Sequence, residues 1–229
     1  MILQLLRGMQ GDMSDLDMAA LLVNFAAVAV VLLLCLPMHE FAHAWAAKKL
    51  GDDTAWMHGR LTLNPSKHLD VFGTLMILFV GFGYAKPVPV NPRNFKNYKK
   101  GMALTAAAGP LTNLIMALVF CVVSKFMWYF RSDTTGGEYM LLFGFFYTLF
   151  SKNVMLMVFN LIPFPPLDGS RILDLILSHK ASMFLAEHEH IMRWAVFALL
   201  IFSSPISWLS ELATRGIDVL VSLPFKLLL

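Results

Sequence analysis

The sequence predicts a polytopic α-helical membrane protein, with about four spanning helices and a membrane-associated β-strand or re-entrant region between the first two. Of its 229 residues, 58% are apolar and only 14% are charged, and the chain contains 19 Phe and 15 Met. Soluble domains carry about 25% charged residues, so this composition favours burial in lipid and excludes intrinsic disorder. The net charge of +3 is too small to indicate nucleic acid binding.

Four apolar runs are long enough to cross about 30 Å of hydrocarbon as helices. A cleaved signal peptide is the alternative for the first run, but Arg7 is followed by three aspartates and by no small-residue cleavage site. Both cysteines lie inside these runs, which excludes a disulfide scaffold. The last apolar stretch, 217–229, contains Pro224 and Lys226 and could either lie on the membrane surface or enter it. The predicted spans are 18–47, 102–129, 139–162 and 191–209.

The region 54–95, between the first two spans, is rich in Gly and Pro and does not match a helical pattern. Thr54 to Leu63 roughly alternates between apolar and polar residues, which predicts short strands and turns. Val71 to Phe82 is uncharged but only about 12 residues long, which suits a re-entrant or interfacial segment better than a crossing. Irregular backbone at that depth requires protein or water to satisfy its polar groups.

Basic residues are distributed unequally between the two sides of this topology. The side opposite to the loop 48–100 offers only Arg7, Arg131 and Arg215. The positive-inside rule therefore places the loop in the cytoplasm and the N-terminus outside, so that the first and third spans both end on the cytoplasmic face. The basic residues of the loop are Lys48, Lys49, Arg60, Lys67, Lys86, Arg93, Lys96, Lys99 and Lys100.

A metal-binding pattern stands at the inner end of the first span, in the sequence HEFAH from His39 to His43. The two imidazoles are four residues apart and therefore share one face of a helix, with Glu40 beside them. Two neutral histidines, a third protein ligand and a water form a tetrahedral zinc site, and the carboxylate can take a proton from that water. The alternative is a set of interfacial polar residues that extend to the lipid headgroups.

A third ligand is expected at the same depth, and the end of the third span supplies Asp168 within NLIPFPPLDG. Three prolines stop the helix, and Gly169 allows a tight turn that can direct the Asp168 carboxylate inward. The alternative is that Asp168 caps a helix that begins at Ser170. The free backbone groups of the proline segment, with the Asn160 amide, could pair with an extended peptide.

Taken in order, the motifs of this chain resemble the site-2 protease family of intramembrane zinc metalloproteases, specifically the small bacterial members that lack PDZ and CBS domains. The resemblance covers most of the chain, with one mild departure at Val71, where relatives often have proline. Five segments match in order: HEFAH with the following Gly51-Asp52, GRLTLNP with His68 and Asp70, GYAKPVPVNPRNF ending at Phe95, GPLTN from Gly109 to Asn113, and NLIPFPPLDGSRIL from Asn160 to Leu173.

The resemblance implies a role for each candidate residue. Glu40 would be the general base, and Asn160, together with Asn113, would help to hold the substrate or the oxyanion. The region from about 56 to 90 would correspond to the membrane-associated β-sheet and re-entrant loop of the family. The ligands of a single zinc ion per chain would be His39, His43 and Asp168.

By the same resemblance, the chain is a zinc metalloendopeptidase of the bacterial cytoplasmic membrane that hydrolyses peptide bonds within or near the transmembrane helices of its substrates. Residues 1–229 would form one integral membrane domain in contact with the bilayer, with the active site toward the cytoplasm. The sequence defines neither the substrate nor the oligomeric state. A catalytically inactive zinc-binding scaffold is one alternative, against which Glu40 argues. An ion transporter is the other, although the second and fourth spans contain few ionisable groups apart from Lys125 and Arg193.

The remaining polar candidates have ordinary structural interpretations. For His68 and Asp70 we expect local turn hydrogen bonds. Cys35, one turn before His39, is expected to be a small buried hydrophobic residue. Loop or turn positions are expected for His58, His179, His188 and His190.

Overall fold

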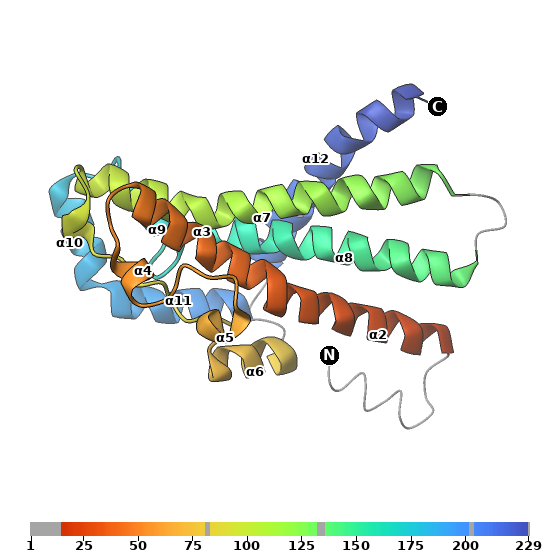
Figure 1. The fold of residues 1–229 in the computed structure, drawn as a ribbon, viewed down its shortest axis with the longest axis horizontal. Helices are drawn as coiled ribbons and strands as arrows, with labels where there is room; N and C mark the ends of the chain where they lie inside the picture. Colours follow the sequence, from red (N-terminus) through yellow and green to blue (C-terminus); the bar gives the residue numbers. More distant parts are fainter. Residues whose placement is uncertain (1–14, 81–82, 132–135, 202–203, 229) are drawn as a thin grey trace.

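The computed structural model describes residues 15–80, 83–131, 136–201 and 204–228, and these residues are almost entirely helical. Three long rods lie side by side, and shorter helices gather at one end of them (Figure 1). The first rod is continuous and consists of α2 (Asp15–Val30), the π-helical turn η1 (Val31–Cys35) and α3 (Leu36–Lys49). The other elements are α4 (Thr54–Met57), α5 (Pro65–His68), α6 (Val71–Val80), the 3-10 turn η2 (Pro92–Asn94), α7 (Tyr98–Tyr129), α8 (Gly137–Asn160), α9 (Asp168–Asp174), α10 (His179–Glu187), α11 (Glu189–Ile201) and α12 (Ser204–Leu228).

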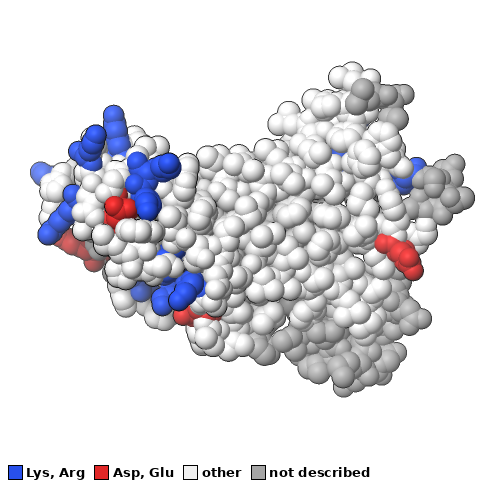
Figure 2. Space-filling model, in the orientation of Figure 1, with Lys and Arg blue, Asp and Glu red and all other residues white. Residues whose placement is uncertain are grey.

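Three helices in the described chain are long and apolar enough to cross a membrane: Asp17–Lys49, Tyr98–Tyr129 and Gly137–Asn160. They coincide closely with the first three predicted spans. Figure 2 shows that the middle of this face is uncharged and that Lys and Arg gather over the end that carries α9 and α10. A broad apolar belt between charged ends is the surface that a bilayer requires.

The predicted fourth span, 191–209, does not form one membrane-crossing helix among the described residues. Helix α11 is described over the 13 residues Glu189–Ile201, about 20 Å, and α12 begins at Ser204, while residues 202–203 of the predicted span lie outside the described residues. The apolar run of the sequence therefore extends over parts of two helices.

The short strands predicted from residue 54 onward are also not formed. Helices α4 and α5 take their place, and among the described residues only an isolated antiparallel bridge joins Leu69 to Ala85. Local capping accounts for α5, which follows the alternating stretch, whereas Asp53 at the start of α4 makes no side-chain capping bond. The Asn64 side chain accepts a hydrogen bond from the Ser66 amide, and Pro65 occupies the first position of α5, where its fixed φ favours a helix.

Helix α6 accounts for the described part of the stretch 71–82, and residues 81–82 lie outside the described chain. Its ten residues extend about 15 Å, too short for a crossing. Gly73 and Gly83 fit closely together at its base, because a Cβ on Gly83 would lie 2.1 Å from the Gly73 carbonyl oxygen. Ile77 and Leu78 pack against the core of the long rods.

Two apolar clusters hold the rods together. The first joins η1 to α7 and α8 through residues such as Leu32, Met116 and Leu149. The second joins α7 and α8 around Phe150, which is fully buried, and α12 packs against it. Helix α12 includes the undecided stretch 217–229, apart from the terminal residue. It is fixed by an ion pair of 2.7 Å between Lys125 Nζ and an Asp218 carboxylate oxygen.

The π-helical turn lies one helical turn before the first histidine of the HEFAH motif. The Leu36 amide donates to the Val31 carbonyl, five residues back rather than four. Pro37 follows immediately and is buried. Since proline has no N–H and its ring clashes with the carbonyl four residues earlier, a locally wider turn allows the helix to continue past it.

Candidate metal centre

His39 and His43 lie one turn apart on α3 and are both buried, with 5% and 8% exposure. Their second ring nitrogens are held by α7. His39 Nδ1 lies 2.5 Å from the Asn113 side-chain oxygen, and His43 Nδ1 lies 2.8 Å from the Thr105 carbonyl oxygen. Both acceptors are oxygens, so each Nδ1 donates its hydrogen and each Nε2 presents a lone pair.

The orientation of the Asn113 amide follows from its other partner. Its Nδ2 donates to the Asn153 side-chain oxygen at 3.1 Å, and Asn153 Nδ2 donates to the Leu149 carbonyl at 2.8 Å. This chain of bonds leaves the Asn113 oxygen for His39. Asn113 and Asn153 are both fully buried, so this chain of hydrogen bonds is a rigid support for the His39 ring.

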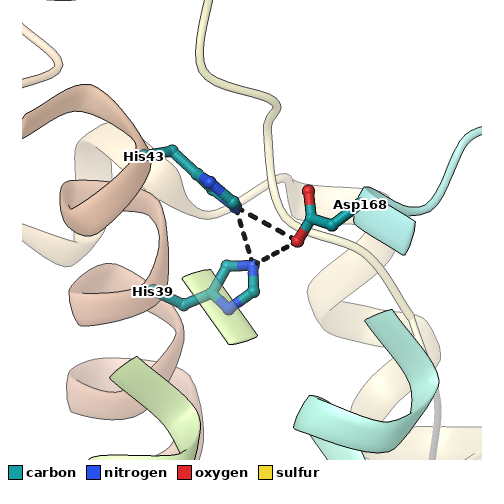
Figure 3. A group of neighbouring side chains, drawn as sticks. All are labelled: His39, His43 and Asp168. Atoms are coloured by element: carbon teal, nitrogen blue, oxygen red, sulfur yellow. Dashed lines mark hydrogen bonds and ion pairs between the residues drawn. The ribbon is translucent and has the colours of Figure 1, made fainter. Parts of the chain in front are cut away.

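Asp168 completes a compact triangle of ligand atoms (Figure 3). Its Oδ2 atom lies 3.4 Å from His39 Nε2 and 3.3 Å from His43 Nε2, and the two Nε2 atoms are 3.0 Å apart. In a tetrahedral zinc site with ligand bonds of about 2.0–2.1 Å, the ligand atoms lie about 3.3 Å from one another. The two edges that join Asp168 to the histidines match this spacing, and the edge between the two nitrogens is about 0.3 Å shorter.

The chemistry of the three atoms also fits a cation. Asp168 Oδ2 is buried and accepts no hydrogen bond among the described residues. The two Nε2 atoms that face it carry lone pairs, because Nδ1 holds the hydrogen in each ring. Three electron-rich atoms at van der Waals distance repel one another unless a positive charge lies between them.

Two glycines make room for this arrangement. A Cβ on Gly109 would lie 2.4 Å from His43 Nε2 and 2.5 Å from His39 Cε1, so α7 can approach the rings only with glycine at this position. A Cβ on Gly169 would lie 2.3 Å from the Leu161 carbonyl oxygen. The turn after α8 can therefore fold back closely enough to carry Asp168 to the histidines.

The other candidate residues differ in whether they contact the residues of the triangle. Glu40 is buried at 8% exposure on the same turn of α3 as His39. Asn160 is the last residue of α8, and its Nδ2 donates to the Leu156 carbonyl of its own helix at 2.9 Å. No hydrogen bond joins Asn160 to the triangle within the described chain. Asn113, by contrast, contacts a histidine directly.

Arg60 was not singled out by the sequence reasoning, although it lies in the GRLTLNP segment. Its guanidinium is buried and donates to the carbonyl oxygens of Lys86 and Pro87. Burial lowers the pKa of Arg60, and the negative charge of Glu40 opposes that shift. Arg60 thus holds the extended segment after α6 by hydrogen bonds and lies close enough to Glu40 to interact with its charge.

The expected local bonds of His68 and Asp70 are confirmed. His68 is fully buried with Nε2 at 2.6 Å from the Thr62 carbonyl, and its own carbonyl accepts the Lys86 amide at 2.7 Å. Asp70 accepts the Gly73 amide at 2.8 Å, at the first turn of α6. The bond between His68 and Lys86 joins the segment before α6 to the segment after it, and the Asp70 bond caps the first turn of α6.

A second buried carboxylate, Asp52, organises the loop after α3. It accepts hydrogen bonds from the Thr54 hydroxyl and amide, from the Asn91 amide and from Asn94 Nδ2. Burial by itself raises the pKa of Asp52, but these hydrogen bonds outweigh it, and the net pKa is lowered. Asp52 therefore remains an anion.

The chain is similar over 27–203 to the family model of peptidase family M50. It is 45% identical to the Bacillus subtilis protein named "Putative zinc metalloprotease YwhC", over 64% of this chain and 67% of that protein. It is 31% identical to zinc metalloprotease MJ0392 of Methanocaldococcus jannaschii, over 69% of this chain but only 36% of that longer protein. No solved structure matches the chain.

The apolar helices, the His-His-Asp triangle and these relatives together define an integral membrane protein that is a zinc-binding metalloprotease. The matched region includes all three residues of the triangle. The chain belongs to peptidase family M50, the site-2 protease family. The described residues contain no PDZ or CBS domain.

Proposed function

We propose that this chain is an intramembrane endopeptidase that hydrolyses peptide bonds within or near the transmembrane helices of other proteins. The observation that carries the proposal is the triangle of two Nε2 atoms and one carboxylate oxygen, built at the end of an apolar helix long enough to span a membrane. Polar ligands are costly at that place, so they are expected to serve a function.

In the proposed site, His39, His43 and Asp168 hold one zinc ion. When bound there, zinc would supply a Lewis acid able to polarise a carbonyl oxygen and to lower the pKa of water toward 7. Glu40, beside His39 on α3, accepts the proton of the attacking water and returns it to the leaving amine.

Two groups on α7 act on the histidines rather than on the substrate. The Asn113 side chain and the Thr105 carbonyl fix the tautomer and direction of the rings. Asn160 remains our candidate for substrate contact, because only one of its amide hydrogens is used by α8. Its oxygen and second hydrogen can pair with an extended peptide.

The substrate must unwind before it is cut, because a helix hides its carbonyls in intrahelical bonds. Helix-weakening Gly, Pro or Asn in the target should therefore favour cleavage. We propose that the extended segment after α6 offers an edge to the unwound peptide and that α6 enters the membrane as a re-entrant element. We further propose that residues 1–229 act as one domain of the bacterial cytoplasmic membrane, with no nucleic acid partner.

The orientation that we propose for the protein in the membrane follows from the distribution of its Lys and Arg residues. The basic end of the molecule, which also carries the triangle, faces the cytoplasm, and the N-terminus lies outside. Cleavage is then expected near the cytoplasmic end of the substrate helix. A cysteine-accessibility assay on Glu138 and Lys67 replaced singly by Cys tests this, since the two positions lie on opposite sides of the proposed topology.

The central experiment compares detergent-purified wild type with Glu40→Gln and with Glu138→Gln, an exposed carboxylate in the first turn of α8. Zinc content is measured together with cleavage of a reporter transmembrane helix that contains Asn-Pro. We expect one zinc per chain in all three proteins, and cleavage by the wild type and Glu138→Gln only. Zinc without cleavage by any of them would favour an inactive scaffold, and wild type without zinc would refute the site.

A further inference from the structure

We propose that a pocket between the end of α3 and the start of α7 binds the headgroup of one anionic phospholipid. The pocket has a volume of about 330 Å³. Three lysines stand around it, Lys49, Lys96 and Lys100, and apolar side chains form its walls, namely Leu50, Phe95 and Leu104. This combination of three cations and an apolar wall matches a phosphate group attached to a hydrocarbon chain.

Within the described residues, no carboxylate compensates the positive charge of the pocket. No Asp or Glu lines it, and none of its three lysines forms an ion pair within the described chain. Neighbouring lysines differ in this respect, since Lys48 lies 3.8 Å from an Asp53 carboxylate oxygen and Lys99 donates to two backbone carbonyls. An anion from outside the chain is therefore the expected partner.

The position of the pocket favours a lipid over a soluble anion. Leu104 lies on α7, one of the proposed membrane spans, and is 57% exposed. Trp45 and Tyr98 are each about half exposed at the same ends of α3 and α7, and such aromatic residues concentrate at the level of the headgroups. A free phosphate would leave the apolar wall unmatched, whereas a phospholipid covers it.

A glycine shapes the pocket. A Cβ on Gly101 would lie 2.3 Å from the ring of Phe95, so glycine at this position lets the ring pack on the first turn of α7. Leu104 also precedes Thr105, whose carbonyl holds His43. A lipid bound here would bridge α3 and α7 about one turn from the metal-holding bonds, and it should raise the thermal stability of the protein.

The test uses the full chain in detergent, with native mass spectrometry to count bound lipid during titration with short-chain phosphatidylglycerol or phosphatidylcholine. The double variant Lys96→Gln, Lys100→Gln removes two pocket charges. The control, Lys67→Gln with Lys180→Gln, removes two exposed charges outside the pocket. Each juxtamembrane lysine contributes roughly fivefold to binding, so we expect the pocket variant to bind one phosphatidylglycerol about 30-fold more weakly and the control to be unchanged.

Three outcomes would overturn the proposal. Equal binding of the two lipids by wild type would show that the lysines do not select an anion. An equal loss in the control variant would assign the preference to the whole basic surface. Displacement of the lipid by inorganic phosphate at similar concentration would identify a soluble anion site. The first and third outcomes use wild type alone, so they do not depend on whether a variant folds.

Discussion

Replacement of Gly109 by Ala should strongly weaken zinc binding. The new Cβ would lie 2.4 Å from His43 Nε2 and 2.5 Å from His39 Cε1, about 1 Å inside normal van der Waals contact. Metal ligands must keep their distances within about 0.2 Å. Because a displacement of this size also breaks the bonds to Asn113 and Thr105, we expect zinc affinity to fall by at least 100-fold, beyond the usual range for loss of one outer hydrogen bond.

The same substitution has two opposing effects on α7 itself. Ala is favoured over Gly in a helix by up to about 1 kcal/mol, but Gly109 immediately precedes Pro110, and the proline ring crowds a Cβ on the residue before it. The matched control is Gly144→Ala in α8, where a new Cβ meets no atom within 4 Å. Zinc content is measured by elemental analysis, and stability by thermal unfolding with and without chelator. Wild-type zinc affinity in Gly109→Ala would refute the geometry of the triangle.

Three further predictions concern residues around the site. Asn113→Leu leaves His39 Nδ1 without its acceptor, so zinc affinity should fall by about 10- to 100-fold in a zinc titration, and an unchanged affinity would contradict the tautomer assigned here. Arg60→Leu removes charge-assisted bonds to backbone carbonyls, including the one at Pro87, and should destabilise the fold by about 2–4 kcal/mol in thermal unfolding. Asp52 has a lowered pKa when folded, so its stabilisation is complete above the unfolded value near 3.9 and is lost as pH falls through the folded value. Asp52→Asn should therefore reduce stability at neutral pH and flatten the acid limb of a stability-versus-pH curve. An acid limb as steep as that of wild type would assign it to other carboxylates.

The long helices could be predicted from the sequence because their signal is local and strong. A run of some twenty apolar residues fits few structures other than a buried helix. The histidine pair of the HEFAH motif required only the helical repeat, and Asp168 was found because two spans of the same direction must end on one face. Both inferences use chain geometry alone, without knowledge of side-chain packing.

The supports of the site could not be found in this way. The Thr105 carbonyl that holds His43 is a backbone atom, which every residue possesses. Asn113 was noticed, but its contact with His39 depends on how α3 and α7 pack. The short helix α5 depends on a single capping residue, Asn64, which the pattern of apolar residues does not reveal. Such a cap contributes about 1 kcal/mol.

The π-helical turn before the HEFAH motif sets the angular phase of the first rod. An α-helix rotates by about 100° per residue, so one residue added in a wide turn rotates everything after it by that angle relative to α2. The wide turn therefore sets the direction of the His39 side chain independently of the direction in which Leu32 packs into the core. Deletion of one residue within 31–35 would leave every side chain of the site in the protein and yet turn both histidines away from Asn113.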